Sequence, residues 1–229
     1  MEEYDTNTLV IAGDFGYPFN LKKLPNQHFI FVLKQLKLKY KYIVYVAGNH
    51  EQFQARQLDL STIEIDLHIR AICEELSIVF LQKETWIHPE TKVCFAGCTL
   101  WSNIDETAQM NDFNKIFRFR DEYLQLHRDH SRWLTETIQE YKEGPMIVVT
   151  HHLPSFAGIS KEYWGGNNTG YASNLDHLFQ KPVVAWICGH THTPNFKFIN
   201  GIPLIINPIG YPKELKTTTK RHGLIEIPL

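Results

Sequence analysis

The chain has 229 residues, which is long enough for one large domain or two small ones, and its formal net charge is -2. Hydrophobic residues make up 43% and charged residues 21%, a balance that favours a buried core and excludes a disordered chain. The basic residues are scattered, so the sequence has no electrostatic footprint for nucleic acid or for an anionic membrane.

No segment resembles a linker, so we expect residues 1–229 to form a single domain. The first five residues lack the cationic and apolar parts of a secretory signal, and the longest apolar runs, such as 183–188, are too short to cross a bilayer. The four cysteines show neither paired spacing nor the density of a disulfide scaffold. These features predict a cytoplasmic protein with buried thiols and no membrane association; the oligomeric state stays open.

Apolar, β-branched runs bounded by glycine, proline or asparagine predict strands. In chain order they cover 9–12, 42–47, 92–96, 146–150, 183–188 and 203–206. Apolar residues with helical spacing lie between several of them, over 29–36, 65–76 and 134–141. The late stretch 196–227 predicts added antiparallel strands. This alternation is typical of an α/β fold in which helices cover a sheet.

Side chains that bind metals follow four of the predicted strands. They are Asp14 after 9–12, Asn49, His50 and Glu51 after 42–47, His151 and His152 after 146–150, and His190 and His192 after 183–188. Because the carboxyl ends of strands in an open α/β sheet meet along one edge, we expect these side chains in one crevice. Carboxylate, amide and imidazole ligands together suit Mn, Fe, Zn or Co rather than Ca.

Each of these pieces alone has an ordinary structural explanation. Gly-Asp is often only a turn, and a histidine after a strand is usually a hydrogen-bonded structural residue. Their joint occurrence at four strand ends is what favours a metal centre. The glycines at 13, 48 and 189 suit the sharp turns that such strand ends need.

The same residues resemble the calcineurin-like metallophosphoesterases. The matching motifs, in family order, are Gly13-Asp14, Gly48-Asn49-His50-Glu51, Thr150-His151-His152-Leu153-Pro154-Ser155 and Gly189-His190-Thr191-His192. A subgroup of small, poorly characterised phosphoesterases is similar at Gly97-Cys98-Thr99-Leu100-Trp101, Met110-Asn111-Asp112-Phe113, Asn207-Pro208 and Gly210-Tyr211-Pro212. The resemblance runs from about Leu9 to the end of the chain.

The resemblance implies two mixed β-sheets packed as a sandwich between helices, with a site for one or two divalent transition-metal ions. Asp14 would bridge both ions; Asn49, His151 and His190 would complete the first site, and His192 would serve the second. A metal-activated hydroxide would then hydrolyse a phosphomonoester or phosphodiester.

The resemblance also implies roles for three residues beside these ligands. His50 would polarise the phosphate or protonate the leaving oxygen. Glu51 and His152 would orient the ligands. Two alternatives to the enzyme remain: a catalytically impaired module that binds one metal or a phosphate, and an interaction protein without a metal.

The start of the chain departs from the family pattern. The family has an earlier strand that ends in Asp-x-His and supplies two ligands to the ion that His192 serves. Only eight residues precede Leu9, and they include Asp5 but no histidine and no apolar strand. We expect that the sequence begins inside a longer protein and lacks this first strand; the alternative is a short form that binds one metal.

The chain's single Asp-x-His, Asp66-Leu67-His68, lies in a segment with helical spacing of isoleucines. On a helix, residues two apart point about 200 degrees away from each other, so we expect no shared ligand role for Asp66 and His68.

Several other residues keep two interpretations. Arg118 and Arg120 could bind phosphate as a planar fork or be ordinary surface arginines. Trp101 could line a pocket or pack in the core. The segment 163–170 predicts a loop that lines a pocket or simply covers the surface. Ile209 stands where the subgroup usually has a basic residue.

Overall fold

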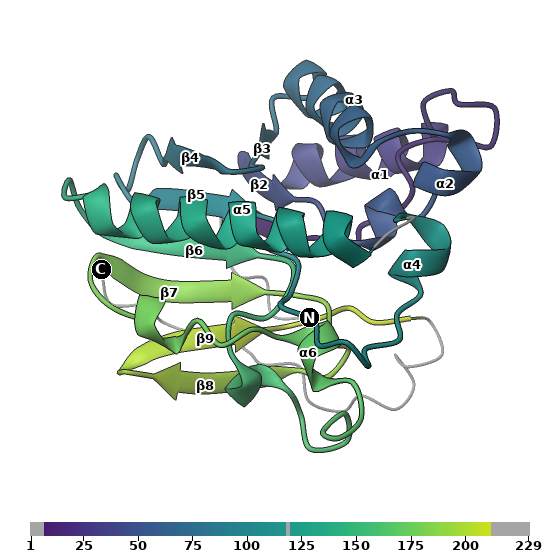
Figure 1. The fold of residues 1–229 in the computed structure, drawn as a ribbon. Helices are drawn as coiled ribbons and strands as arrows, with labels where there is room; N and C mark the ends of the chain where they lie inside the picture. The colour runs from purple at the N-terminus through teal and green to yellow at the C-terminus, as the bar shows by residue number, and fades with distance from the viewer. Residues whose placement is uncertain (1–6, 118–119, 212–229) are drawn as a thin grey trace.

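The computed structural model describes residues 7–117 and 120–211 of the chain. Its strands form two sheets that pack face to face (Figure 1). The smaller sheet is parallel, in the order β1 (Thr8–Ala12), β2 (Tyr42–Val46) and β3 (Val79–Phe80). The larger has the order β4 (Glu84–Ile87), β5 (Cys94–Cys98), β6 (Met146–Thr150), β7 (Val183–Cys188), β9 (Ile202–Ile206) and β8 (Asn195–Ile199). Only β4 and β8, at its two edges, run antiparallel to their neighbours.

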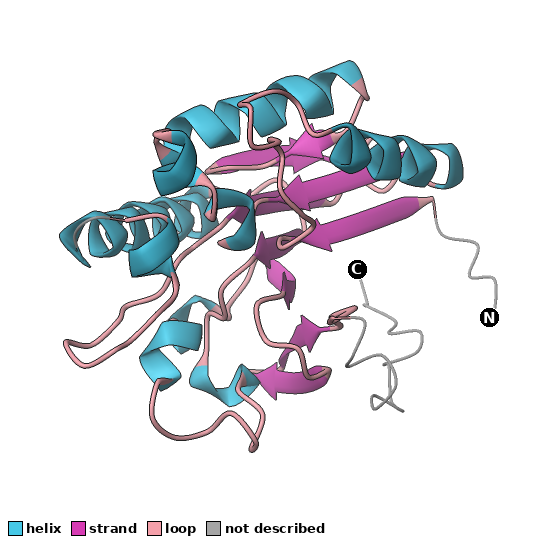
Figure 2. Cartoon of the chain, turned by 90° about the vertical axis from the view of Figure 1, so that its right-hand side faces the viewer, coloured by secondary structure: helices cyan, strands magenta, loops and turns pink. Residues whose placement is uncertain are grey.

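Helices cover the outer faces of both sheets, and Figure 2 shows the strands between them. The longer ones are α1 (Gln27–Lys39), α3 (Thr62–Glu75) and α5 (Arg120–Glu140). The shorter ones are α2 (Ala55–Leu58), α4 (Asp112–Lys115) and α6 (Asn168–Tyr171), with 3-10 turns η1 (His50–Gln52), η2 (Phe156–Gly158) and η3 (Asp176–Leu178). Helices α1 and α3 share a core with the smaller sheet, and α5 shares one with the larger. The layers are therefore helix, sheet, sheet, helix.

The alternation of side chains along each strand builds this sandwich. In β2, Ile43 and Tyr45 pack under the helices, whereas Val44 and Val46 pack between the sheets. All four are fully buried. A strand buried on both faces reads as a continuous apolar run, which explains why these strands were predicted from the sequence.

The two sheets meet at the carboxyl ends of β1, β2, β6 and β7, where three glycines allow close approach. A Cβ on Gly13 would lie 2.3 Å from Nδ1 of His151, and one on Gly189 would lie 2.5 Å from the carbonyl oxygen of Ala12. Of the three glycines predicted to make sharp turns, only Gly13 has a positive φ, of 82°. Gly48 and Gly189 instead provide space between strand ends, which corrects the sequence-based explanation.

The predicted α/β fold with two sheets between helices is confirmed. The structure adds β3 and β4, which the sequence did not predict: β3 has two residues, and most of β4 is exposed. The late antiparallel strands are present as the β8–β9 hairpin, and the predicted part after residue 211 lies outside the described residues. Among residues 7–117 and 120–211, none of the helices combines the length and apolar character of a membrane span.

Candidate metal centre

Four side chains from four different strand ends converge on one point. Nε2 of His151 lies 3.0 Å from Oδ1 of Asn49, 3.1 Å from Nδ1 of His190 and 3.2 Å from Oδ1 of Asp14. For bonds of roughly 2.1–2.2 Å in an octahedral arrangement, neighbouring ligand atoms lie about 3.0–3.1 Å apart. The spacing of these donors therefore fits a divalent ion.

The hydrogen bonds of His151 decide which of its nitrogens faces this point. The ring is fully buried, and its Nδ1 lies 2.8 Å from the carbonyl oxygen of Ala12. A carbonyl only accepts hydrogen bonds, so Nδ1 carries the proton and the lone pair is on Nε2. That lone pair faces two further acceptors, Oδ1 of Asp14 and Oδ1 of Asn49. A cation bound among these acceptors removes their mutual repulsion, as does a second proton on His151.

The pKa values of His151, Asp14 and His190 are all shifted by burial and by the charges of their neighbours. Burial lowers the pKa of His151, but the Asp14 carboxylate and the Ala12 carbonyl outweigh it and raise this pKa above its ordinary value. Burial raises the pKa of Asp14, but the adjacent His151 outweighs it and holds this pKa below the ordinary range. Burial, followed by the effect of His151, lowers the pKa of His190 to about 3. His190 is therefore neutral at pH 7, the state in which imidazole binds a metal.

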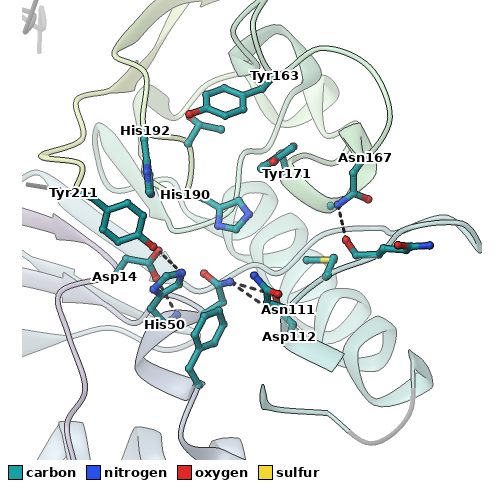
Figure 3. A pocket seen from close by; sticks show the side chains of 16 residues that line it. Asp14, His50, Asn111, Asp112, Tyr163, Asn167, Tyr171, His190, His192 and Tyr211 are labelled. Carbon is teal, nitrogen blue, oxygen red and sulfur yellow. Dashed lines mark hydrogen bonds and ion pairs between the residues drawn. The ribbon is translucent and has the colours of Figure 1, made fainter. Parts of the chain in front are cut away.

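Two of these residues have left-handed backbones, which are rare outside glycine. The φ of Asp14 is 57° and that of His190 is 66°. Each side chain leaves its strand end in the direction of His151 (Figure 3 labels Asp14 and His190). Unfavourable backbone conformations of this kind cost of order 1–3 kcal/mol and cluster at functional sites.

Glu51 joins the turn after β1 to the turn after β2. It is fully buried, and its carboxylate accepts hydrogen bonds from the backbone N–H of Asp14 at 2.9 Å, Phe15 at 2.5 Å and Gly48 at 2.7 Å. The backbone N–H of Gly16 donates a fourth, at 3.3 Å, and the hydroxyl of Tyr45 a fifth, at 2.8 Å. Glu51 therefore fixes the backbone that carries Asp14, as the predicted orienting role requires; the role itself stays a prediction.

His152 lies behind the four donors. Its ring centroid is 4.1 Å from that of His190, and Nδ1 lies 3.4 Å from the carbonyl oxygen of Thr99. A ligand nitrogen from each of His151, His152 and His190 lies within 4.8 Å of the others. Burial lowers the pKa of His152, so the ring is neutral. This position suits a residue that supports His190.

His50 and His192 line the mouth of the site, in a cavity of about 230 Å³ (Figure 3). The backbone N–H of His50 donates to Oδ1 of Asp14 at 3.0 Å, and its ring Nε2 lies 3.9 Å from Oδ2 of Asp14. Its ring stacks on Phe53 with centroids 4.1 Å apart. The ring of His192 packs edge to face against Tyr211 at 4.7 Å. The cavity thus has two further imidazoles beside the buried cluster.

The opposite wall of the cavity comes from two segments, each of which runs from a loop into a short helix. The first contributes Gln109, Met110, Asn111 and, in α4, Asp112; the second contributes Tyr163, Asn167 and, in α6, Gly170 and Tyr171. The segment 163–170 is a loop up to residue 167, and its last three residues belong to α6; of its two interpretations the pocket-lining one is confirmed. Figure 3 shows Tyr163, Tyr171 and Asn167 facing Asp14 and His50 across the opening.

Asp112 contacts the site, although no role for it was predicted. Its carboxylate accepts from Nδ2 of Asn49, and it is only 3% exposed. The Met110-Asn111-Asp112-Phe113 motif was noted as a likeness, and that likeness was the only available signal. A contact 63 residues away in sequence follows from the position of α4 and not from any local pattern.

Asp66 and His68 lie in α3, away from the four donors. Asp66 accepts from the side-chain amides of Gln52 at 2.7 Å and Gln82 at 2.8 Å. His68 stacks on Phe19 with centroids 3.9 Å apart. The two side chains therefore have separate partners, and the prediction that this Asp-x-His has no shared ligand role fits their geometry.

Arg120 and Trp101 both have structural contacts. The guanidinium of Arg120 donates to the backbone carbonyls of Asp105 at 2.6 Å and Ala108 at 2.8 Å. The indole of Trp101 is 2% exposed and packs against Phe117 with ring centroids 5.2 Å apart, so it is a core aromatic. Arg118 and Asp5 lie outside the described residues.

The comparison with protein families agrees with this geometry. The family model for calcineurin-like phosphoesterases matches residues 1–194, which include all four converging strand ends. The chain belongs to the calcineurin-like phosphoesterases. Hydrolysis of phosphate esters is thus the general activity of its family, and divalent metals are the ions that this family binds.

Individual relatives of this phosphoesterase are distant. The uncharacterized protein L509 of Acanthamoeba polyphaga mimivirus is 29% identical over 234 residues, which cover 92% of this chain and 80% of that protein. The crystal structure of phosphopantetheinyl hydrolase from Mycobacterium tuberculosis has a TM-score of 0.71 at 15% identity, covering 94% of this chain and 83% of that one. A dimetal phosphatase from Danio rerio superposes with a TM-score of 0.47 at 11% identity, covering 90% and 88%. The likeness to the mycobacterial structure shows the shared fold.

Proposed function

We propose that this phosphoesterase hydrolyses phosphomonoesters or phosphodiesters with the help of one or two divalent transition-metal ions. The observation that carries the proposal is the set of three donors within 3.2 Å of Nε2 of His151, at the inner end of an open cavity. This donor set mixes carboxylate, amide and imidazole groups and fits Mn, Fe, Zn or Co.

The first ion would be held by Asp14, Asn49, His151 and His190, and a second by Asp14 and His192. When bound, such ions activate water and neutralise the phosphoryl oxygens. The chain's own contribution is to hold these ligands in a fixed direction. Glu51 does so by accepting from the backbone N–H of Asp14, and the carbonyl of Ala12 does so by accepting from Nδ1 of His151.

His50 is the residue we propose for proton transfer or phosphate polarisation. Its ring lines the cavity beside Asp14, 29% exposed at the side chain, and so a substrate can reach it. Burial lowers its pKa, so at pH 7 the ring is mostly neutral and carries one N–H donor. A donor in this position can stabilise a phosphoryl oxygen or a leaving oxygen.

Turnover of chromogenic phosphomonoesters and phosphodiesters with added Mn²⁺ tests the proposal. We expect His50→Ala to lower kcat by about 10²- to 10⁴-fold while Mn²⁺ still binds. The matched control is His28→Ala, because His28 lies on the exposed side of α1 and should not affect turnover. If the wild-type chain binds Mn²⁺ but hydrolyses no ester, the enzymatic proposal is wrong.

A second candidate function is a module that binds one ion without catalysis. It is favoured by the small number of ligands proposed for the second ion, which are Asp14 and His192. Counting ions separates the two: one tightly bound ion without turnover favours the module, and two with turnover favour the enzyme.

A further inference from the structure

The amide of Asn49 lies between the candidate metal centre and a buried carboxylate. Its Oδ1 is 3.0 Å from Nε2 of His151, and its Nδ2 donates to Oδ1 of Asp112 at 3.2 Å and to Oδ2 at 3.4 Å. Asn49 and Asp112 are each 3% exposed. The contact between the two side chains is therefore largely shielded from water.

The orientation of this amide decides whether Asn49 can be a ligand. The oxygen and nitrogen ends of an asparagine amide have nearly the same shape, but only the oxygen can bind a cation. An ionised carboxylate accepts hydrogen bonds and does not donate them, so Asp112 is satisfied only by Nδ2. This pairing directs Oδ1 toward His151.

Asp112 is itself held through the residue that follows it. Nη1 of Arg56 donates to the carbonyl oxygen of Phe113 at 2.8 Å, and the guanidinium of Arg120 lies over the Phe113 ring at 4.8 Å. Two arginines thus fix the residue that follows Asp112. The carboxylate can therefore hold the amide in place and is not simply carried along by it.

We propose that Asp112 is a positioning residue: it holds the Asn49 amide with Oδ1 toward the ion and prevents the flipped arrangement. The inference rests on the proposed function, since it concerns the first ion site. It assigns to the first residue of α4 a task in metal binding, although Asp112 supplies no ligand atom to the point where the four donors converge.

The affinity for Mn²⁺, measured by calorimetry without any substrate, is the direct readout. Asp112→Leu has a similar size but accepts no hydrogen bond, so it should weaken Mn²⁺ binding about 10- to 100-fold. Asp112→Asn keeps one carbonyl acceptor and should lose much less. The matched control is Asp105→Leu, in the same segment, whose side chain bonds Thr107 and Thr169 and not Asn49; it should leave the affinity unchanged.

A double-mutant cycle separates positioning from general structural support. If Asp112 acts only through Asn49, then Asp112→Leu should have no further effect on Mn²⁺ affinity in a chain that already carries Asn49→Ala. Additive losses would overturn the inference, as would an unchanged affinity in Asp112→Leu alone.

An exchange of the two side chains keeps the test decisive if Asp112→Leu fails to fold. Asn49→Asp alone sets two carboxylates against each other and should weaken Mn²⁺ binding, and adding Asp112→Asn should restore it. Failure of the exchange to restore binding would overturn the inference while leaving the proposed function intact. A wild-type chain that binds no Mn²⁺ would instead refute the proposed function, and this inference with it.

Discussion

Gly48 lies so close to Asp14 that a Cβ on Gly48 would be 2.3 Å from Oδ1 of Asp14. The turn after β2 therefore packs directly on the carboxylate that ends β1. A methyl group at Gly48 has to displace either the backbone or the side chain that we propose as the bridging ligand.

We expect Gly48→Ala to destabilise the fold by about 1–3 kcal/mol and to abolish tight Mn²⁺ binding, because both strand ends must separate. Urea unfolding and calorimetry measure the two effects. Gly144→Ala is the control, since a Cβ there meets nothing within 4 Å. Unchanged metal binding in Gly48→Ala would contradict the proposed ligand role of Asp14.

Glu51→Gln should be more damaging than an isosteric change usually is. The Glu51 carboxylate accepts five hydrogen bonds, and a glutamine would turn an NH₂ group toward at least one of these donors. Each buried donor left unpaired costs about 1–3 kcal/mol. We therefore expect a clear loss of stability and of Mn²⁺ affinity in urea unfolding and calorimetry.

Tyr45→Phe offers a milder comparison, because it removes only one of the five donors to Glu51. The buried carboxylate keeps its four backbone partners, so the loss of stability should be smaller than in Glu51→Gln. Equal effects of the two substitutions would argue against Glu51 as the centre of this network.

His130 makes the stability of the chain depend on pH. The ring is 3% exposed, and Nδ1 accepts a hydrogen bond from the backbone N–H of Leu100 at 3.1 Å. Burial lowers its pKa from 6.5 to about 3. Between these two values the unfolded chain binds a proton that the folded chain does not, so this contribution is complete above pH 6.5 and is lost as the pH falls.

His130→Asn keeps an acceptor for Leu100 but does not titrate. The stability of the wild type relative to this variant should fall by up to about 1.4 kcal/mol per pH unit between pH 6.5 and 3. Urea unfolding at several pH values measures the difference. A constant difference across this range would show that His130 is not buried in its neutral form.

Removal of the metal should lower the thermal stability. At an ion concentration 100 times Kd, binding stabilises the folded state by about 2.7 kcal/mol, or roughly 5–10 °C in Tm for a chain of this size. A chelator should reverse this shift in the wild type and have no effect on Asp14→Ala. Equal melting of the wild type with and without chelator would favour an interaction protein that has no metal.

The sequence predicted the fold where burial controls it. Strands such as β2 and β6 are apolar on both faces, so the runs 42–47 and 146–150 were recognisable without a structure. Strand β4 was not recognisable, because three of its four residues are exposed. It forms through its antiparallel pairing with β5. Long-range pairing of this kind leaves no local pattern.

In the candidate site, the proposed ligands could be predicted from the sequence and the groups that support them could not. Asp14, Asn49, His151 and His190 were predicted because each lies within three residues of a strand end, and the ends of parallel strands meet. Their supports were harder to predict. The carbonyl of Ala12 that fixes His151, and the carboxylate of Asp112 that meets Asn49, depend on distances that only the folded chain defines.

The most direct test of the account is a crystal structure of the Mn²⁺-loaded protein with anomalous scattering data. We predict an anomalous peak at about 2.0–2.3 Å from Oδ1 of Asp14, Oδ1 of Asn49, Nε2 of His151 and Nδ1 of His190. A protein that retains these side chains in place but shows no peak among them, at saturating Mn²⁺, would contradict it.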